Sequence, residues 1–174
     1  MPMRKIARLP GFLHFRSSLP VSHHAAVDAK IAALGEAGHE LPYFLDGDGA
    51  VEDAVRAMLG NNAELDECRH IHLNPRPGGK RLATDWHCDD YDGGPWPASY
   101  RWAMLFYFPQ VVPLEMGPIA VRASDGREVV TIGPAGTCLL IRQDTVHRAT
   151  TNRTDRVRRA IKYLFRSGCA IPKQ

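Results

Sequence analysis

The periodicity of the sequence changes from helical to strand-like before the middle of the chain, and this change limits the folds available to it. Apolar residues recur at helical spacing over residues 22–35 and again from Val51 to Leu59, where Gly60 ends the pattern. From about residue 69 the pattern becomes alternating or continuously apolar, over short runs that Gly and Pro separate. These runs cover residues 70–73, 101–108, 119–122, 128–132, 137–142 and 156–165. The order predicts an α+β protein, mainly β, whose N-terminal helices pack on an antiparallel sandwich or barrel.

Two local signals add detail to this prediction. Asp125-Gly126 lies between two of the short runs and predicts a tight hairpin. Near the N-terminus, Phe12, Leu13 and Phe15 stand among prolines and indicate a short strand or extended arm packed on the domain.

The size and composition are those of one ordinary globular domain. A chain of 174 residues can bury a substantial core, and its 15 Gly and 13 Pro suit many turns and short strands. We expect a single domain over residues 1–174, with helical support in residues 1–68 and a β core in residues 69–166.

The cysteines and the hydropathy indicate where such a protein is found. The four cysteines show no C-x-x-C pairing, which argues against a structural zinc site and against a disulfide framework. No apolar run reaches the length of a membrane span. We therefore expect a soluble cytoplasmic protein without a membrane partner, either a monomer or a homodimer.

The segment from Thr84 to Tyr91 places an imidazole and a carboxylate two positions apart in a run that reads as extended. Side chains at i and i+2 of a strand share a face, so His87 and Asp89 can point at one site. His147 is a candidate third donor. Two histidines and one carboxylate form the ligand set of non-haem Fe(II) oxygenases, which leaves metal positions open.

A second pair of histidines competes with this assignment. His70 and His72 would share a strand face, but no Glu follows them where a cupin-type site would need one. We interpret both as ordinary strand histidines.

A wider set of residues extends the metal motif into a family pattern. Trp86-His87-Cys88-Asp89, Glu115-Met116-Gly117-Pro118, the stretch from Gly136 to Val146, and His147 with Asn152, Thr154 and Arg158 follow one another in this order. Together they resemble the phytanoyl-CoA hydroxylase-like family of Fe(II)/2-oxoglutarate dioxygenases over residues 70–166.

The resemblance implies a fold and a chemistry. The fold is a double-stranded β-helix, a cupin-like jelly-roll. Fe(II) is bound by His87, Asp89 and His147, and 2-oxoglutarate and O2 are co-substrates. In the family an arginine eleven positions after the second histidine pairs with the distal carboxylate of 2-oxoglutarate, and here that residue is Arg158.

The implied reaction converts 2-oxoglutarate into succinate and CO2 and hydroxylates an aliphatic C–H of a small molecule, such as an amino acid, a natural-product intermediate or an acyl group. The presence of Asp89 favours hydroxylation over halogenation. Desaturation, epimerisation and cyclisation use the same ligands, so the sequence does not separate them.

Strand alternation conflicts with the role that the resemblance gives to Arg158. Alternation groups Arg159 with the apolar Ile161, Tyr163 and Phe165, whereas Arg158 falls on a face that looks wetter. A bulge, or a helix that covers the outer apolar face, would reconcile the two patterns. Arg159 is therefore an alternative partner for the carboxylate.

Other features leave the substrate open. The chain is compact and lacks the P-G-S-H element that many relatives carry after Gly117-Pro118, so the pocket is open or is completed by a partner subunit. Trp102 is a candidate pocket residue.

Two other functions remain open. One is a cupin-like protein that holds a metal or ligand without turnover. The other is a nucleic-acid dioxygenase, which we do not favour because Arg159 and Arg166 are seven positions apart, on opposite strand faces, whereas the paired arginines of those enzymes are six apart.

Overall fold

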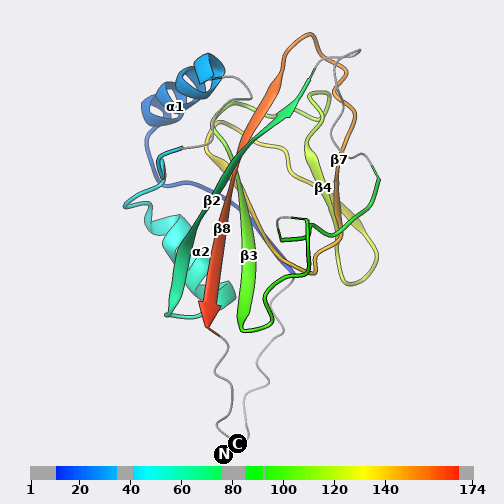
Figure 1. Ribbon diagram of the computed structural model, residues 1–174. Helices are drawn as coiled ribbons and strands as arrows, with labels where there is room; N and C mark the ends of the chain where they lie inside the picture. Colours follow the sequence, from blue (N-terminus) through cyan, green and yellow to red (C-terminus); the bar gives the residue numbers. More distant parts are fainter. Residues whose placement is uncertain (1–10, 35–40, 76–84, 92, 169–174) are drawn as a thin grey trace, which may run out of the picture.

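Two antiparallel sheets lie face to face, and two helices cover the outer side of the larger sheet (Figure 1). The computed structural model describes residues 11–34, 41–75, 85–91 and 93–168. In chain order the elements are β1 (Phe12–Arg16), α1 (Val21–Leu34), α2 (Gly49–Leu59), β2 (Ala63–Asn74), β3 (Tyr100–Phe108), β4 (Ile119–Arg122), β5 (Glu128–Val130), β6 (Thr137–Arg142), β7 (His147–Ala149) and β8 (Arg158–Gly168).

The larger sheet has the strand order β1-β6-β3-β8-β2, and the smaller sheet has the order β5-β4-β7. Both faces of the larger sheet are buried because side chains alternate between two cores. On β3, Leu105 and Tyr107 pack under the helices, whereas Met104 and Phe106 face the smaller sheet. The prediction of a mainly β protein with antiparallel sheets is confirmed, and the described residues contain two helices. None of the described helices is long and apolar enough to cross a membrane.

Most predicted elements are present, with shifted ends where strands pair over a long sequence distance. Both helices, the hairpin at Asp125-Gly126 and the strand Thr137–Arg142 are confirmed, and β1 joins the edge of the larger sheet. The prediction that the first core strand begins near residue 69 is wrong, because β2 begins at Ala63, where it pairs with Ser167 of β8. Local periodicity does not reveal this pairing, because Ser167 is far from Ala63 in the sequence.

The structure explains why strand alternation and the family spacing disagree about Arg158 on β8. The pairing of β2 with β8 keeps one register from His70 to Asn74, so no bulge lies beside Arg158. Instead the helices cover the apolar face: Ile161 and Tyr163 belong to the same core as Val27 and Val51. The face that looks wetter in the sequence is therefore the inner face, between the sheets.

Asp48 fixes the start of α2 and ties it to the chain before α1. Its buried carboxylate accepts hydrogen bonds from the Ser17 and Ser18 hydroxyls, and from the backbone N–H groups of Ser18, Ala50 and Val51. Burial alone would raise the pKa of Asp48, but these hydrogen bonds outweigh it and keep the pKa below its usual value. One carboxylate thus satisfies the first turn of the helix and positions it against the sheet.

A network of amide hydrogen bonds fastens the two sheets together beside Arg158. The Asn74 amide, at the end of β2, donates to the carbonyls of Gly117 and Thr150 at 2.8 Å each. The Asn152 amide donates back to the carbonyl of Asn74 at 3.0 Å. Gly117 has φ +71°, and a Cβ there would lie 2.3 Å from Asn74 Nδ2. The glycine is required for this close approach, and Asn74 pairs directly with Arg158 on β8.

We expect Asp48→Ala to lower the free energy of unfolding by about 2–4 kcal/mol, because it leaves buried donors without an acceptor and removes a helix N-cap. Asp53→Ala is the control, since Asp53 pairs with Arg56 on the exposed side of the same helix. Urea unfolding followed by circular dichroism measures both. Equal stability of the two variants would contradict this account of Asp48.

Gly117→Ala should destabilise the protein by roughly 3–5 kcal/mol, because it combines an unfavourable φ with overlap against backbone and amide atoms. Gly126→Ala is the matched control: its φ is +85°, but a Cβ there meets nothing within 4 Å. The same unfolding measurement compares the two. If both substitutions lower the free energy of unfolding equally, the close approach at Gly117 does not contribute to the loss.

Candidate metal centre

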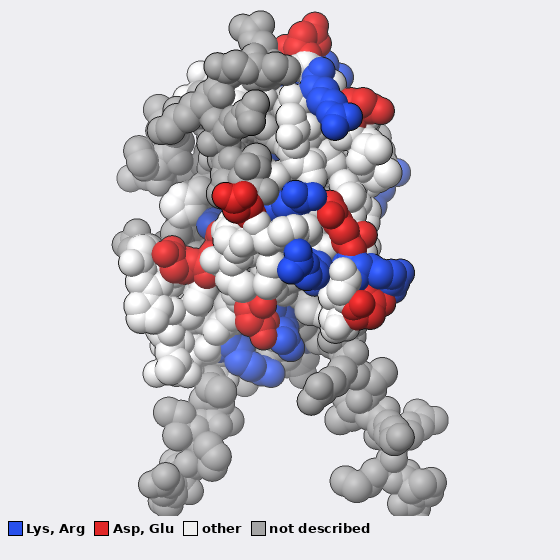
Figure 2. Space-filling view, turned by 90° about the vertical axis from the view of Figure 1, so that its right-hand side faces the viewer, with Lys and Arg blue, Asp and Glu red and all other residues white. Residues whose placement is uncertain are grey.

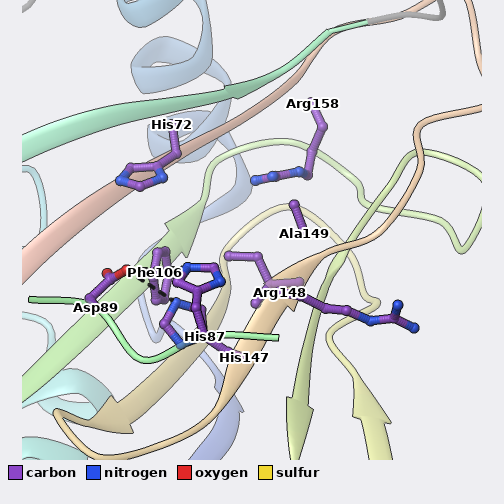
Figure 3. Close-up of a pocket in the computed structure, with 9 residues that line it drawn as sticks. His72, His87, Asp89, Phe106, His147, Arg148, Ala149 and Arg158 are labelled. Carbon is purple, nitrogen blue, oxygen red and sulfur yellow. Dashed lines mark ion pairs between the residues drawn. The ribbon is translucent and has the colours of Figure 1, made fainter. Parts of the chain in front are cut away.

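The three predicted metal donors come together between the sheets (Figure 3). His87 and His147 face each other across two backbone hydrogen bonds, of 3.0 Å and 2.9 Å, which join the segment around His87 to the first residue of β7. Asp89 Oδ1 lies 3.4 Å from His87 Nε2 and 3.6 Å from His147 Nε2. Their donor atoms all lie within 4.8 Å of one another, and among the described residues no other group of three His, Cys, Asp or Glu does so.

Hydrogen bonds set which nitrogen of each histidine faces this point. His87 Nδ1 lies 2.8 Å from the carbonyl of Asp85, and His147 Nδ1 lies 3.0 Å from the carbonyl of Thr145. Each Nδ1 therefore carries the hydrogen and donates a hydrogen bond to the carbonyl. Each Nε2 is then left with a lone pair.

The charge state also suits a divalent metal. Burial lowers the pKa of His147, which keeps its imidazole neutral. For Asp89 burial acts to raise the pKa, but the charge and hydrogen bond of Lys162, together with His147 and His72, outweigh it, so the pKa is lowered and the carboxylate is ionised. The set of two imidazoles and one carboxylate fits Fe(II) in its chemistry.

A cavity of about 200 Å³ adjoins the three donors. Its remaining walls come from both sheets and are His72, Phe106, Ile119, Arg148, Ala149 and Arg158. The Arg158 side chain extends into it from the wall opposite His87 and His147 (Figure 3).

Arg158 is fully buried, and its three guanidinium nitrogens have no hydrogen-bond partner among the described residues. Burial lowers the pKa of Arg158 to about 10, so the group remains charged at neutral pH. A buried charge without a partner is costly, and buried polar groups are normally hydrogen-bonded. The cavity therefore offers an unsatisfied cation that a carboxylate can pair with in a bidentate manner.

The other arginines considered from the sequence are occupied. Arg159 lies on the outer face of β8 and forms a two-point ion pair with Asp28 of α1, at 2.8 Å for both contacts. Arg166 lies 3.4 Å from Asp66 and 3.7 Å from Glu64.

Trp102, the candidate pocket residue, does not line this cavity. It packs in an aromatic cluster with Tyr91, Trp96 and Tyr100, at ring-centroid distances of 4.9–5.8 Å.

Sequence reasoning missed two residues of the site. His72, interpreted as an ordinary strand histidine, lines the cavity with its ring against Phe106, whereas His70 is exposed. Burial, followed by the charges of Lys162 and Arg158, lowers the pKa of His72 to about 3, so its ring is neutral. Lys162 Nζ lies 3.1 Å from Asp89 Oδ2. The available signal was spacing, because Lys162 is four positions from Arg158 on one strand face.

Comparison with known proteins supports the fold. No family model matches the sequence, and no curated protein matches it. Among solved structures, EvdO2 from Micromonospora carbonacea var. aurantiaca superposes with a TM-score of 0.70 at 17% identity, covering 95% of this chain and 91% of that one.

Two further structures match to a similar degree. The epimerase SnoN in complex with Fe3+, alpha ketoglutarate and nogalamycin RO has a TM-score of 0.70 at 16% identity, covering 92% of this chain and 80% of that one. The non-heme monooxygenase ThoJ, as a Ni complex, has a TM-score of 0.68 at 17% identity, covering 91% and 74%. At these identities the likeness establishes the fold alone, which this chain shares with SnoN, EvdO2 and ThoJ.

Proposed function

We propose that the protein is an Fe(II)- and 2-oxoglutarate-dependent oxygenase of the phytanoyl-CoA hydroxylase-like family, whose two sheets form a double-stranded β-helix. The observation that carries the proposal is Arg158, a buried cation that lies over the Phe108 ring but has no hydrogen-bond partner among the described residues, in the same cavity as the three metal donors. A protein that only holds a metal has no use for such a cation. A small dicarboxylate that reaches from the metal to Arg158 would explain both the group of three donors and the buried guanidinium.

In this proposal His87, Asp89 and His147 hold the metal and leave its other positions for small ligands. Bound there, iron with 2-oxoglutarate as reductant would activate O2, releasing succinate and CO2. Arg158 fixes the distal carboxylate of the co-substrate, and its attraction is strong because water is excluded around it. Phe106, Ile119 and Ala149 give the cavity apolar walls that keep water away from the reacting groups.

The proposed reaction is hydroxylation of an aliphatic C–H in a small molecule, and Asp89 as a carboxylate donor supports it. The fold is shared with an epimerase and a carbocyclase, so the fold alone does not select hydroxylation. Two observations weigh against nucleic acid as the substrate. Arg159 and Arg166 are engaged by acids, and Figure 2 shows basic and acidic side chains interspersed over the side of the molecule that carries the smaller sheet.

Arg158→Ala should weaken 2-oxoglutarate binding to the Fe(II)-loaded protein by roughly 100-fold, since loss of one partner of a buried charge pair costs about 2–5 kcal/mol. Arg158→Lys should give an intermediate loss, because an ammonium keeps the charge without the bidentate fork. Anaerobic titration, followed by the visible metal-to-ligand charge-transfer band, measures the affinity.

Arg159→Ala is the matched control for this titration. Its partner is Asp28 on the outer face, so 2-oxoglutarate affinity should stay within about threefold of the wild type. If Arg158→Ala binds 2-oxoglutarate as tightly as the wild type does, Arg158 does not bind its distal carboxylate. A folded, iron-loaded wild type that gives no band at all would refute the oxygenase and favour a non-catalytic metal-binding protein.

A further inference from the structure

We propose that Lys162 is a positioning residue that reserves one oxygen of the Asp89 carboxylate for itself, so that only the other oxygen is offered to the metal. The inference rests on the proposed metal centre, but not on the identity of the co-substrate.

The two oxygens of Asp89 have different surroundings. Oδ1 faces the two imidazoles, at 3.4 Å from His87 Nε2 and 3.6 Å from His147 Nε2. Oδ2 faces away from them and lies 3.1 Å from Lys162 Nζ, which donates a hydrogen bond to it. The side chains of Lys162 and Asp89 are only 13% and 18% exposed, so this ion pair is much less screened than a surface pair.

The backbone on both sides of the ion pair is fixed. Lys162 lies on β8, where it pairs with His70 of β2 and Phe106 of β3, so its strand has neighbours on both sides. The carbonyl of Asp89 accepts a hydrogen bond of 2.8 Å from the Trp96 indole N–H. Because both backbone segments are held, Asp89 can move only by rotation of its side chain. The Lys162 ammonium opposes that rotation.

Rotation matters because a carboxylate can bind a cation through one oxygen or through both. Binding through both would occupy a metal position that the two histidines and one oxygen leave open. A co-substrate that chelates the metal, together with O2, needs all three remaining positions. The charge of Lys162 repels a metal cation, so this residue is poorly explained as an aid to affinity, whereas control of the carboxylate explains its place.

Binding of Mn(II) to the purified protein tests the inference without a co-substrate. Water-proton relaxation reports the number of exchangeable waters on bound Mn(II), and electron paramagnetic resonance gives its affinity. In Lys162→Met we expect the loss of one of about three waters, which lowers the inner-sphere relaxation enhancement by about a third. The affinity for Mn(II) should stay within about threefold, because loss of the repelling charge offsets loss of order in the ligand.

Three variants complete the comparison. Lys162→Arg should keep the wild-type relaxation, because a guanidinium can still donate to Oδ2. Lys162→Leu, which also has no hydrogen-bond donor, repeats the test if the methionine variant does not fold, as judged by circular dichroism and thermal melting. Lys30→Met is the matched control, because Lys30 lies on α1 with its ammonium over the Phe44 ring, outside the cavity.

An unchanged relaxation enhancement in a folded Lys162 variant that has no hydrogen-bond donor would overturn the inference. So would a fall of about tenfold or more in Mn(II) affinity with the water number unchanged, since Lys162 would then only order the ligand. The outcome is separable from the proposed function: failure of the wild type to bind 2-oxoglutarate would refute the oxygenase and leave the relaxation result standing.

Discussion

The guanidinium of Arg158 is enclosed between the two sheets, and the described residues provide it with no hydrogen-bond partner. An uncompensated buried charge costs several kcal/mol, so the surrounding structure has to be stable enough to hold it there. That stability comes from a sheet buried on both faces, with the helices on its outer side tied down by Asp48 and by the Arg159–Asp28 pair. The hydrogen-bond network of Asn74, Gly117 and Asn152 then fixes the backbone next to Arg158.

The inner face of β8 organises the charges of the cavity. Arg158 and Lys162 lie four positions apart on this face with the small Ala160 between them, and His72 packs alongside because it pairs with Ala160. Only Asp89 among the cavity residues brings a negative charge, and His72 and His147 are neutral. A divalent metal and a dicarboxylate would offset each other in charge. In the proposed enzyme Arg158 and Lys162 would have separate roles: Arg158 would bind the co-substrate, and Lys162 would orient the Asp89 carboxylate.

The helices, the Asp125-Gly126 hairpin and the central strands could be predicted because their signals are local. The early start of β2 could not, since it depends on pairing with the far end of β8. His72 looked ordinary because it reaches the site beside Ala160, its cross-strand neighbour, and Lys162 was missed because its partner Asp89 is distant in the sequence. Alternation alone placed Arg158 on a wetter face, and only the helices packed over Ile161 and Tyr163 show that this face is the interior. The catalytic roles of His87, Asp89, His147 and Arg158 stay predictions, as does the assignment of residues 1–174 to a single domain.

The most direct test of the central claim is a crystal structure of the protein with Mn(II) and 2-oxoglutarate, grown without oxygen. We expect Mn(II) between His87, Asp89 and His147, with the distal carboxylate of 2-oxoglutarate paired to both arms of the Arg158 guanidinium. A metal held by these donors while Arg158 pairs with a group of the protein itself, and 2-oxoglutarate is bound elsewhere or not at all, would contradict the claim.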